Sequence, residues 1–355
     1  MKVFMIAGEA SGDVLGARIM RDAPKGFSFS GIGGAEMQEA GLTPLFPMQE
    51  LSVMGVAEIL PRLPNLLRRI RETQDAILAQ KPDVILTIDS PDFSFRVVKG
   101  VKAKWPQAKA IHMVAPTVWA WRQERAKKMA ALYDRLFCLF PFEPAYFTEH
   151  GLDARFVGHP IIDTYHTYPP INRQKNDFLV LFGSRMGEIK RIAPVFMDVC
   201  RVLRGKNPEI SIYSPVFDHL KPVLQDMAGG LPIEWVPATQ RYELFARCGR
   251  AMAVSGTAGL ELSVFGCPHV IGYKMNPLTY ALIKGRVQTP YAHLENIIQN
   301  EMLVPEFLQQ NCTVDALIEG VQSLPEEMSE RQSALMGQLQ KPDGFVWSDP
   351  SLYAF

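Results

Sequence analysis

Short runs of β-branched and other apolar residues alternate with longer amphipathic segments along this chain. Several of these runs lead into glycine, serine or aspartate, and segments with helical periodicity separate them. The runs cover residues 3–7, 84–88, 110–114, 135–139, 178–182, 210–213, 233–236, 250–254 and 269–272. This alternation predicts an α/β protein with parallel sheets and helical crossovers, in which ligands bind beyond the carboxyl ends of the strands.

A break in this pattern divides the chain. Residues 158–172 are rich in proline, tyrosine and polar residues, and a new strand pattern starts at Phe178. We therefore expect a linker at 160–176 between two Rossmann-like domains that enclose a cleft, residues 1–165 and residues 176–325. The pattern leaves open whether the last segment, residues 326–355, packs back on the first domain.

Composition narrows the functional class. A chain of 355 residues exceeds what one hydrophobic core usually organises, in agreement with two domains. Lys plus Arg equals Asp plus Glu at 37 each, so no net positive field would hold a nucleic acid. The five cysteines include no CxxC pair, which argues against a zinc site and for a reducing compartment.

The N-terminus and the hydropathy favour a cytoplasmic location. Met1 and Lys2 lead directly into an apolar strand pattern, without the longer apolar core and cleavage site of a signal peptide. No apolar run approaches the ~20 residues that span a bilayer. Contact with a membrane is therefore expected to be peripheral.

Two turns that follow strand patterns in the first half carry carboxylates. Gly8 lets the backbone approach a ligand, Glu9 follows it, and Ser11 can cap the next helix; an ordinary turn with a solvated Glu9 explains the pattern equally well. Asp89 and Asp92 follow the run at 84–88, and we expect one of them to cap a helix. Asp89, nearer to the strand, is the predicted general base.

A loop-to-helix segment of the first half contains Trp119 and Arg122. A tryptophan face can stack on a sugar or cover an acyl chain, and an arginine can bind phosphate, although core packing explains a single tryptophan equally well. His112 lies inside an apolar strand pattern and is expected to be a core histidine.

Residues 51–78 combine an apolar run around Met54 with clustered arginines. Apolar surface beside basic residues is typical of proteins that bind anionic membranes. The alternative is an ordinary amphipathic helix with a solvated basic face, and only a lipid substrate would favour the membrane interpretation.

Two turns of small residues follow strand patterns in the second half. Gly183-Ser184-Arg185 offers backbone N–H groups, a helix N-terminus and a guanidinium, which together suit a diphosphate leaving group. Ser255-Gly256-Thr257 is a second such turn, and Glu261 in the following helix could accept hydrogen bonds from ribose hydroxyls. Capped helices with solvated charges are the alternative, but two such turns in one domain favour a nucleoside diphosphate.

Taken in order, these segments resemble the lipid-A-disaccharide synthase family, which consists of glycosyltransferases of GT-B fold. The resemblance covers almost the full chain, and its blocks are specific because they occur in the same order. The residues that carry it are 7–15, 51–56, 88–93, 118–122, 141–143, 156–160, 183–185, 255–261, 272–275, Asn296 and 303–306.

The resemblance implies transfer of 2,3-diacylglucosamine from its UDP carrier to the 6-hydroxyl of 2,3-diacylglucosamine 1-phosphate, with inversion at the anomeric carbon. It implies no metal or other cofactor and a peripheral position on the inner membrane, and it leaves open whether the protein forms a homo-oligomer. The catalytic candidates are Asp89, Glu9 and Asp92. The donor-site candidates are Gly183, Ser184, Arg185, Ser255, Gly256, Thr257, Glu261, Asn296 and Glu301. The acceptor and its acyl chains are expected near Ser11, Met54, Trp119 and Arg122.

The chain departs from the family pattern at two places. Phe182 stands where the family usually has proline, and no basic residue precedes Glu301. Two other functions compete: a UDP-sugar 2-epimerase, which would act on a UDP-sugar alone, and a non-catalytic lipid-binding protein. The combination of Asp89 with Arg185 and Glu261 argues against a pure binding protein, which needs no base opposite a leaving-group site.

Overall fold

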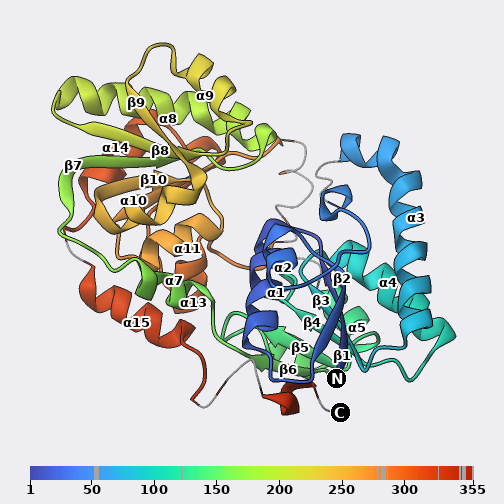
Figure 1. Ribbon diagram of the computed structural model, residues 1–355. Helices are drawn as coiled ribbons and strands as arrows, with labels where there is room; N and C mark the ends of the chain where they lie inside the picture. Colours follow the sequence, from blue (N-terminus) through green and yellow to red (C-terminus); the bar gives the residue numbers. More distant parts are fainter. Residues whose placement is uncertain are drawn as a thin grey trace. The chain divides into compact units, whose positions relative to one another are not determined.

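The computed structural model of the chain describes residues 1–51, 56–120, 123–277, 280, 285, 287–326, 328–343, 345 and 349–353. The chain forms two compact units. The first comprises Met1–His159 and Lys341–Phe355, and the second comprises Pro160–Gln340. Each unit contains a six-stranded parallel sheet with helices packed on it (Figure 1), which confirms the predicted α/β class with two Rossmann-like sheets.

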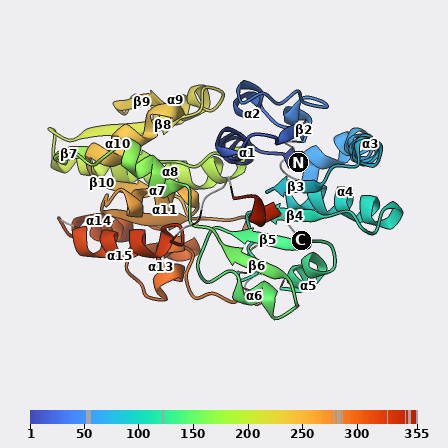
Figure 2. The ribbon, with the colours of Figure 1, turned by 60° about the horizontal axis from the view of Figure 1, so that its bottom comes forward.

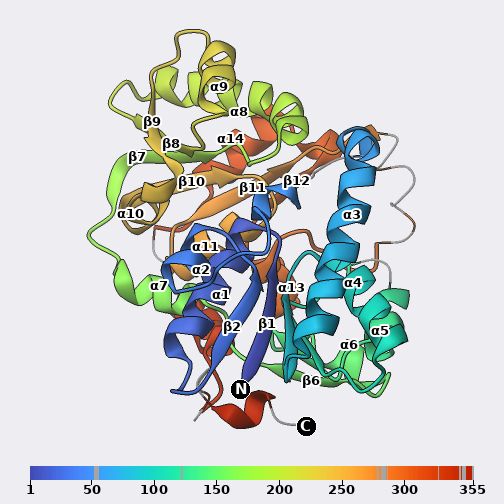
Figure 3. The ribbon, with the colours of Figure 1, turned by 45° about the vertical axis from the view of Figure 1, so that its right-hand side comes forward.

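The sheet of the first unit has the strand order β2-β1-β3-β4-β5-β6. Its strands are β1 (Lys2–Ala7), β2 (Ser28–Ile32), β3 (Val84–Ile88), β4 (Ala110–Met113), β5 (Arg135–Cys138) and β6 (Asp153–Phe156). Its helices are α1 (Ala10–Asp22), α2 (Ala35–Glu39), η1 (Met48–Glu50), α3 (Val56–Gln80), α4 (Pro91–Lys104), α5 (Glu124–Ala130), α6 (Ala145–Thr148) and η4 (Pro350–Tyr353). Helices α1 and α2 lie on one side of this sheet, and α3 and α4 lie on the other (Figures 2 and 3).

The sheet of the second unit has the strand order β12-β11-β10-β7-β8-β9. Its strands are β7 (Gln174–Leu181), β8 (Ser211–Val216), β9 (Ile233–Pro237), β10 (Cys248–Ala253), β11 (His269–Tyr273) and β12 (Glu306–Leu308). Its helices are α7 (Ile161–Thr167), α8 (Met186–Lys206), α9 (Lys221–Ala228), η2 (Ala238–Gln240), α10 (Arg241–Arg247), α11 (Thr257–Val264), α13 (Leu294–Gln299), η3 (Gln309–Asn311), α14 (Val314–Gln322) and α15 (Ser329–Leu339). Helices α8 and α14 cover one face of the sheet, and α10 and α11 cover the other (Figure 1).

The central strands are apolar because helices cover both faces of each sheet. All five residues of β3 are buried, and in β7 the buried residues begin at Phe178. Continuous burial of Val, Ile and Leu is typical of parallel strands with two covered faces. Polar residues are therefore concentrated in the turns at the strand ends, where most of the candidate site residues lie.

The end of the chain is divided between the two units. Arg135 on β5 donates a hydrogen bond to the carbonyl of Ser351 (3.2 Å), so residues from 341 onward complete the first unit. Helix α15 belongs to the second unit, where Gln332 donates to the carbonyl of Val264 at the end of α11 (2.7 Å). The part of the chain that returns to the first sheet therefore follows α15 and does not include it.

Candidate active site

The two carboxylate-bearing turns of the first unit meet because their strands are neighbours. Strands β1 and β3 pair in parallel with their last residues opposite each other, so the turns that follow leave the sheet together. Gly8 lies so close to Ser90 that a Cβ atom at position 8 would come within 2.3 Å of Ser90 Oγ. The turn with Glu9 and the turn with Asp89 therefore share one edge of the sheet, where ligands of such folds bind.

Asp89 has an unusual backbone and a partly buried carboxyl group. Asp89 (φ 54°) and Ser90 (φ 46°) are both left-handed, a conformation that costs energy in residues with a side chain and is concentrated at functional sites. The Asp89 N–H donates to the Met113 carbonyl (3.0 Å), and its carboxylate accepts the Ser90 N–H (2.8 Å). Burial raises the pKa of the Asp89 carboxyl, and the hydrogen bond from Ser90 opposes this shift. A raised proton affinity suits a general base.

Asp92 has a different environment in the first turn of α4. Its side chain is 83% exposed and lies 3.2 Å from the guanidinium of Arg125. The expectation that Asp89 or Asp92 caps α4 is wrong, because Ser90 holds the N-cap position. A solvated carboxylate beside an arginine is a poor general base compared with Asp89.

Helix α1 is linked to the start of α2 by Asp13, a residue that the sequence analysis did not single out. The helix begins at Ala10 with Glu9 at its N-cap, so Ser11 is an exposed residue of the first turn and not the cap. Asp13 is buried and accepts three backbone N–H groups at the start of α2 (2.8 to 3.1 Å). These partners lie 21 to 24 residues away in the sequence, so no local pattern points to them.

Trp119 belongs to the core of the first unit. It is 7% exposed, its ring meets Phe142 edge-on (5.5 Å between centroids), and its indole N–H donates to Glu143 (3.4 Å). The buried Glu143 carboxylate also accepts the N–H groups of Leu139 (3.1 Å) and Phe140 (3.0 Å). Burial raises the pKa of Glu143 to about 8, with these hydrogen bonds acting in the opposite direction. The expected contact of Trp119 with a sugar or an acyl chain has no support from this packing.

Met54 and Arg122, two further residues expected near the acceptor, lie outside the described residues. His112 is buried, with its Nδ1 2.6 Å from Thr87 Oγ1. Burial lowers the pKa of His112 to about 3, so the imidazole is neutral at physiological pH. This confirms the interpretation of His112 as a core histidine.

Helix α3 carries part of the predicted basic cluster. Arg69 is mostly buried between Glu50 and Glu72, and its ion pair with Glu72 measures 2.7 Å. Arg68 is 61% exposed and Leu67 is 41% exposed on the same helix. Within the part of the chain that the structure describes, no helix is long and apolar enough to cross a membrane.

The two small-residue turns of the second unit also lie together. Strands β7 and β10 pair in parallel, and the N–H of Val254 donates to the carbonyl of Leu181 (3.2 Å) at their carboxyl ends. Gly183 has a φ of 92°, which favours glycine at this position. Helix α8 begins directly after the first turn, and α11 begins at Thr257 of the second; neither N-cap residue forms a side-chain cap, so two helix N-termini occur at one edge of the sheet. The exposed residues there are Ser184, Arg185, Gly256 and Thr257.

Arg185 holds the N-cap position of α8 and extends into solvent. Its side chain is mostly exposed, and its guanidinium lies 3.6 Å from the carboxylate of Glu188. Tyr273 donates a hydrogen bond to the same carboxylate (3.4 Å). A solvated guanidinium beside two helix N-termini can bind an anion without disturbing the core.

Glu261 is oriented by two neighbours that the sequence analysis did not identify. Arg241 Nε lies 3.3 Å from one carboxylate oxygen, and the Tyr242 hydroxyl donates to the other (3.1 Å). Burial raises the pKa of Glu261, and the nearby positive charge of Arg241 opposes this. The carboxylate is thus fixed, with lone pairs that remain for further hydrogen bonds.

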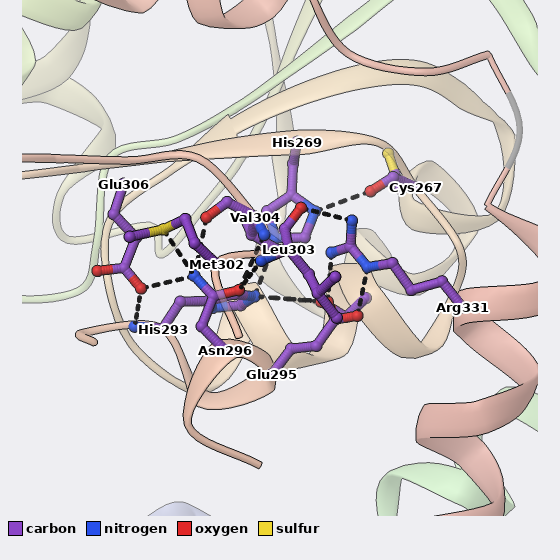
Figure 4. A network of polar contacts seen from close by, with 11 residues as sticks. Cys267, His269, His293, Glu295, Asn296, Met302, Leu303, Val304, Glu306 and Arg331 are labelled. Carbon is purple, nitrogen blue, oxygen red and sulfur yellow. Dashed lines mark hydrogen bonds and ion pairs between the residues drawn. The ribbon is translucent and has the colours of Figure 1, made fainter. Parts of the chain in front are cut away.

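The side chain of Asn296 forms hydrogen bonds with other groups of the protein (Figure 4). The side chain is fully buried. Its Nδ2 donates to the Val304 carbonyl and to the Glu306 carboxylate, both at 2.8 Å. Its Oδ1 accepts the N–H groups of Leu303 (2.9 Å) and Val304 (2.8 Å). These bonds occupy both donors and the acceptor oxygen of the amide. Asn296 therefore shapes the loop that contains the exposed Glu301, and its side chain has no free donor for a ligand.

Comparison with known proteins decides the family. A family model described as lipid-A-disaccharide synthetase matches residues 3–341. The chain belongs to this family. It is 39% identical to the lipid-A-disaccharide synthase of Rhodospirillum centenum over 351 residues, which cover 94% of this chain and 88% of that protein.

Solved structures share the fold at low identity. UDP-GlcNAc 2-epimerase from Neisseria meningitidis, bound to UDP-GlcNAc, has a TM-score of 0.62 at 12% identity over 99% of this chain and 98% of that one. The glycosyltransferase of kitacinnamycin has a TM-score of 0.62 at 16% identity over 95% of this chain and 94% of that one. These similarities confirm the GT-B type of fold.

Family membership identifies the protein as an enzyme, a glycosyltransferase of lipid A biosynthesis that acts on a sugar nucleotide and a lipid-bearing sugar. The epimerase likeness concerns the fold alone, so neither the epimerase nor the non-catalytic alternative is favoured. Among the described residues, no group of three or more His, Cys, Asp or Glu side chains is arranged to hold a metal ion.

Proposed function

We propose that this enzyme transfers 2,3-diacylglucosamine from UDP to the 6-hydroxyl of 2,3-diacylglucosamine 1-phosphate, with inversion of the anomeric centre and release of UDP. The observation that carries the proposal is the Asp89 turn: a partly buried carboxyl with a raised pKa, on a residue with a left-handed backbone, beside the turn of Glu9. A glycosyl acceptor needs such a base, whereas simple binding of a lipid does not.

The reaction is a single displacement. The acceptor oxygen forms a bond to the anomeric carbon while the bond from that carbon to the diphosphate of UDP breaks. The acceptor proton moves to the carboxylate of Asp89, and the negative charge that develops on UDP is stabilised by Arg185 and the N-termini of α8 and α11. Glu9, at the N-cap of α1, is the second carboxylate beside the acceptor.

The donor nucleotide occupies the edge formed by the second unit's two turns. Gly183, Ser184 and the segment Ser255-Gly256-Thr257 supply backbone N–H groups to the diphosphate, and the hydroxyls of Ser184 and Thr257 add further donors. The Glu261 carboxylate, fixed by Arg241 and Tyr242, accepts hydrogen bonds from the ribose hydroxyls. Glu301 lies in the loop that Asn296 shapes, and it contacts the donor from there.

The enzyme works at an anionic membrane surface on the cytoplasmic side. Acyl chains keep both substrates in the bilayer, so the active site must approach the membrane. The exposed Arg68 and Leu67 of α3 combine positive charge with apolar surface, as in proteins that bind such membranes peripherally.

The proposal is tested by incubating the purified enzyme with UDP-2,3-diacylglucosamine and 2,3-diacylglucosamine 1-phosphate in detergent and analysing the products by mass spectrometry. We expect a disaccharide and UDP only when both substrates are present. UDP released without an acceptor, or an isomerised donor, would contradict the proposal and indicate a hydrolase or an epimerase.

A further inference from the structure

The carboxylate of Glu306 collects three N–H donors from one short segment. It accepts the backbone N–H of His293 and the Nδ2 group of Asn296, each at 2.8 Å (Figure 4). It also accepts the backbone N–H of Ala292 at 2.8 Å. Glu306 is the first residue of β12, so the sheet fixes its backbone. The segment before α13 is therefore anchored to a strand through one side chain.

The anchored segment also touches the second small-residue turn. The carbonyl of Ala292 accepts a hydrogen bond from the Ser255 hydroxyl (2.8 Å), so this residue is bound by Glu306 at its N–H and by Ser255 at its C=O. One residue further on, His293 is fully buried against α11, with its Nε2 3.1 Å from Ser263 Oγ. A Cβ atom at Gly259 would lie 2.8 Å from the His293 ring, so the two surfaces fit closely.

We propose that Glu306 is a positioning residue for donor binding. It fixes the Ala292 carbonyl, which accepts the Ser255 hydroxyl. This bond holds the Ser255-Gly256-Thr257 turn in place, so that the backbone N–H groups of the turn can bind the diphosphate of the sugar nucleotide. Glu306 acts through Ala292 and needs no contact with the ligand. This inference rests on the proposed function, because it assumes that the Ser255 turn binds the nucleotide.

A purely structural role is the alternative, and the same segment offers a matched control. Arg331 on α15 forms an ion pair with Glu295 (2.5 Å) and donates to the Leu303 carbonyl (2.8 Å), so it holds the neighbouring part of the network without contacting Ala292. Replacing Arg331 with Gln should lower thermal stability, and replacing Glu306 with Gln should do the same. Only the Glu306 change should alter nucleotide binding.

The experiment is a double-mutant cycle on UDP binding by isothermal titration calorimetry, with full-length wild type, Glu306→Gln, Ser255→Ala and the double variant. We expect each single change to weaken UDP binding about tenfold. Because both changes break the same connection, the double variant should bind UDP with about the same affinity as the single variant that binds it less tightly. Arg331→Gln should bind UDP within about twofold of wild type, and in turnover assays Glu306→Gln should raise the KM for the donor more than it lowers kcat.

The inference would be overturned if the losses of UDP affinity in the two single variants multiplied in the double variant, or if Glu306→Gln bound UDP as tightly as wild type. In both cases, weaker UDP binding by Ser255→Ala would still support the nucleotide site. No UDP binding by the wild type would overturn the proposed function and the inference together. If Glu306→Gln does not fold, amide hydrogen exchange on the wild type tests the same coupling. UDP should increase the protection of the Ala292 and His293 amides, by reciprocity of coupled equilibria, and unchanged exchange would refute the coupling.

Discussion

Gly8 and Ser90 approach each other so closely that position 8 has no room for a side chain. A Cβ atom there would lie 2.3 Å from Ser90 Oγ and 2.8 Å from Ser90 Cβ. This contact joins the Glu9 turn to the Asp89 turn, and it makes the geometry of the proposed base sensitive to a single methyl group.

Gly8→Ala should therefore displace the Asp89 turn. Misplacement of a reacting group by about 1 Å can cost roughly 100-fold in rate, so we expect kcat to fall by about 10- to 100-fold with little change in UDP affinity. The measurement is steady-state kinetics together with UDP titration. Gly205→Ala in α8, where a Cβ meets nothing within 4 Å, is the matched control and should keep full activity. Normal turnover of Gly8→Ala would show that the two turns are not coupled.

Asp89→Asn keeps the shape of the side chain and removes its basicity. We expect a loss of about 10²- to 10⁴-fold in kcat, the usual contribution of a general base, with UDP binding retained. Asp92→Asn should cost far less, because that carboxylate is solvated and paired with Arg125. Comparable losses in both variants, or a near-normal rate for Asp89→Asn, would remove Asp89 from the role of base.

Glu143 should make stability depend on pH. Burial raises the pKa of its carboxyl from the ordinary value of 4.5 to about 8, so between these values the folded protein keeps a proton that the unfolded chain has lost. Stability should then fall as the pH rises from 4.5 towards 8, by at most about 1.4 kcal/mol per pH unit.

Glu143→Gln removes this titration, so its stability should vary less with pH across the same window. Urea unfolding at several pH values between 5 and 9, roughly the window of this shift, measures the slope. The exposed Glu319→Gln is the control and should follow the wild type. Equal slopes for Glu143→Gln and wild type would mean that Glu143 does not titrate in this range.

Arg68→Glu should weaken binding to anionic vesicles. A basic side chain near such a surface contributes about 1 kcal/mol, so reversing its charge should lower the partition coefficient by roughly 10-fold or more. Sedimentation with phosphatidylglycerol vesicles measures this, and neutral phosphatidylcholine vesicles should bind both proteins weakly. Lys206→Glu, an exposed change on the second unit, should bind like the wild type. Equal binding by Arg68→Glu would show that α3 does not face the membrane.

Several features of the site could be predicted from the sequence because they depend on short segments. The run at 84–88 is apolar enough to be a covered strand, and residues after such a strand must lie at the ligand-binding edge of a parallel sheet. The small residues at 183–185 and 255–257 likewise mark turns before helices. Local periodicity and turn chemistry were therefore sufficient for the α/β class and for the position of the proposed nucleotide turns.

The roles of individual side chains depended on contacts between distant segments. Nothing local distinguishes Trp119 as a core residue, since its burial and its bond to Glu143 depend on a loop 24 residues away. In the same way, the bonds of Asn296 and Glu306 exist only because β12 packs beside the segment before α13. The sequence by itself determined strands, turns and their chemical character, through patterns that span a few residues. Only the tertiary structure decided which polar groups satisfy one another and which stay available to a ligand, because burial brings together groups that the chain keeps far apart.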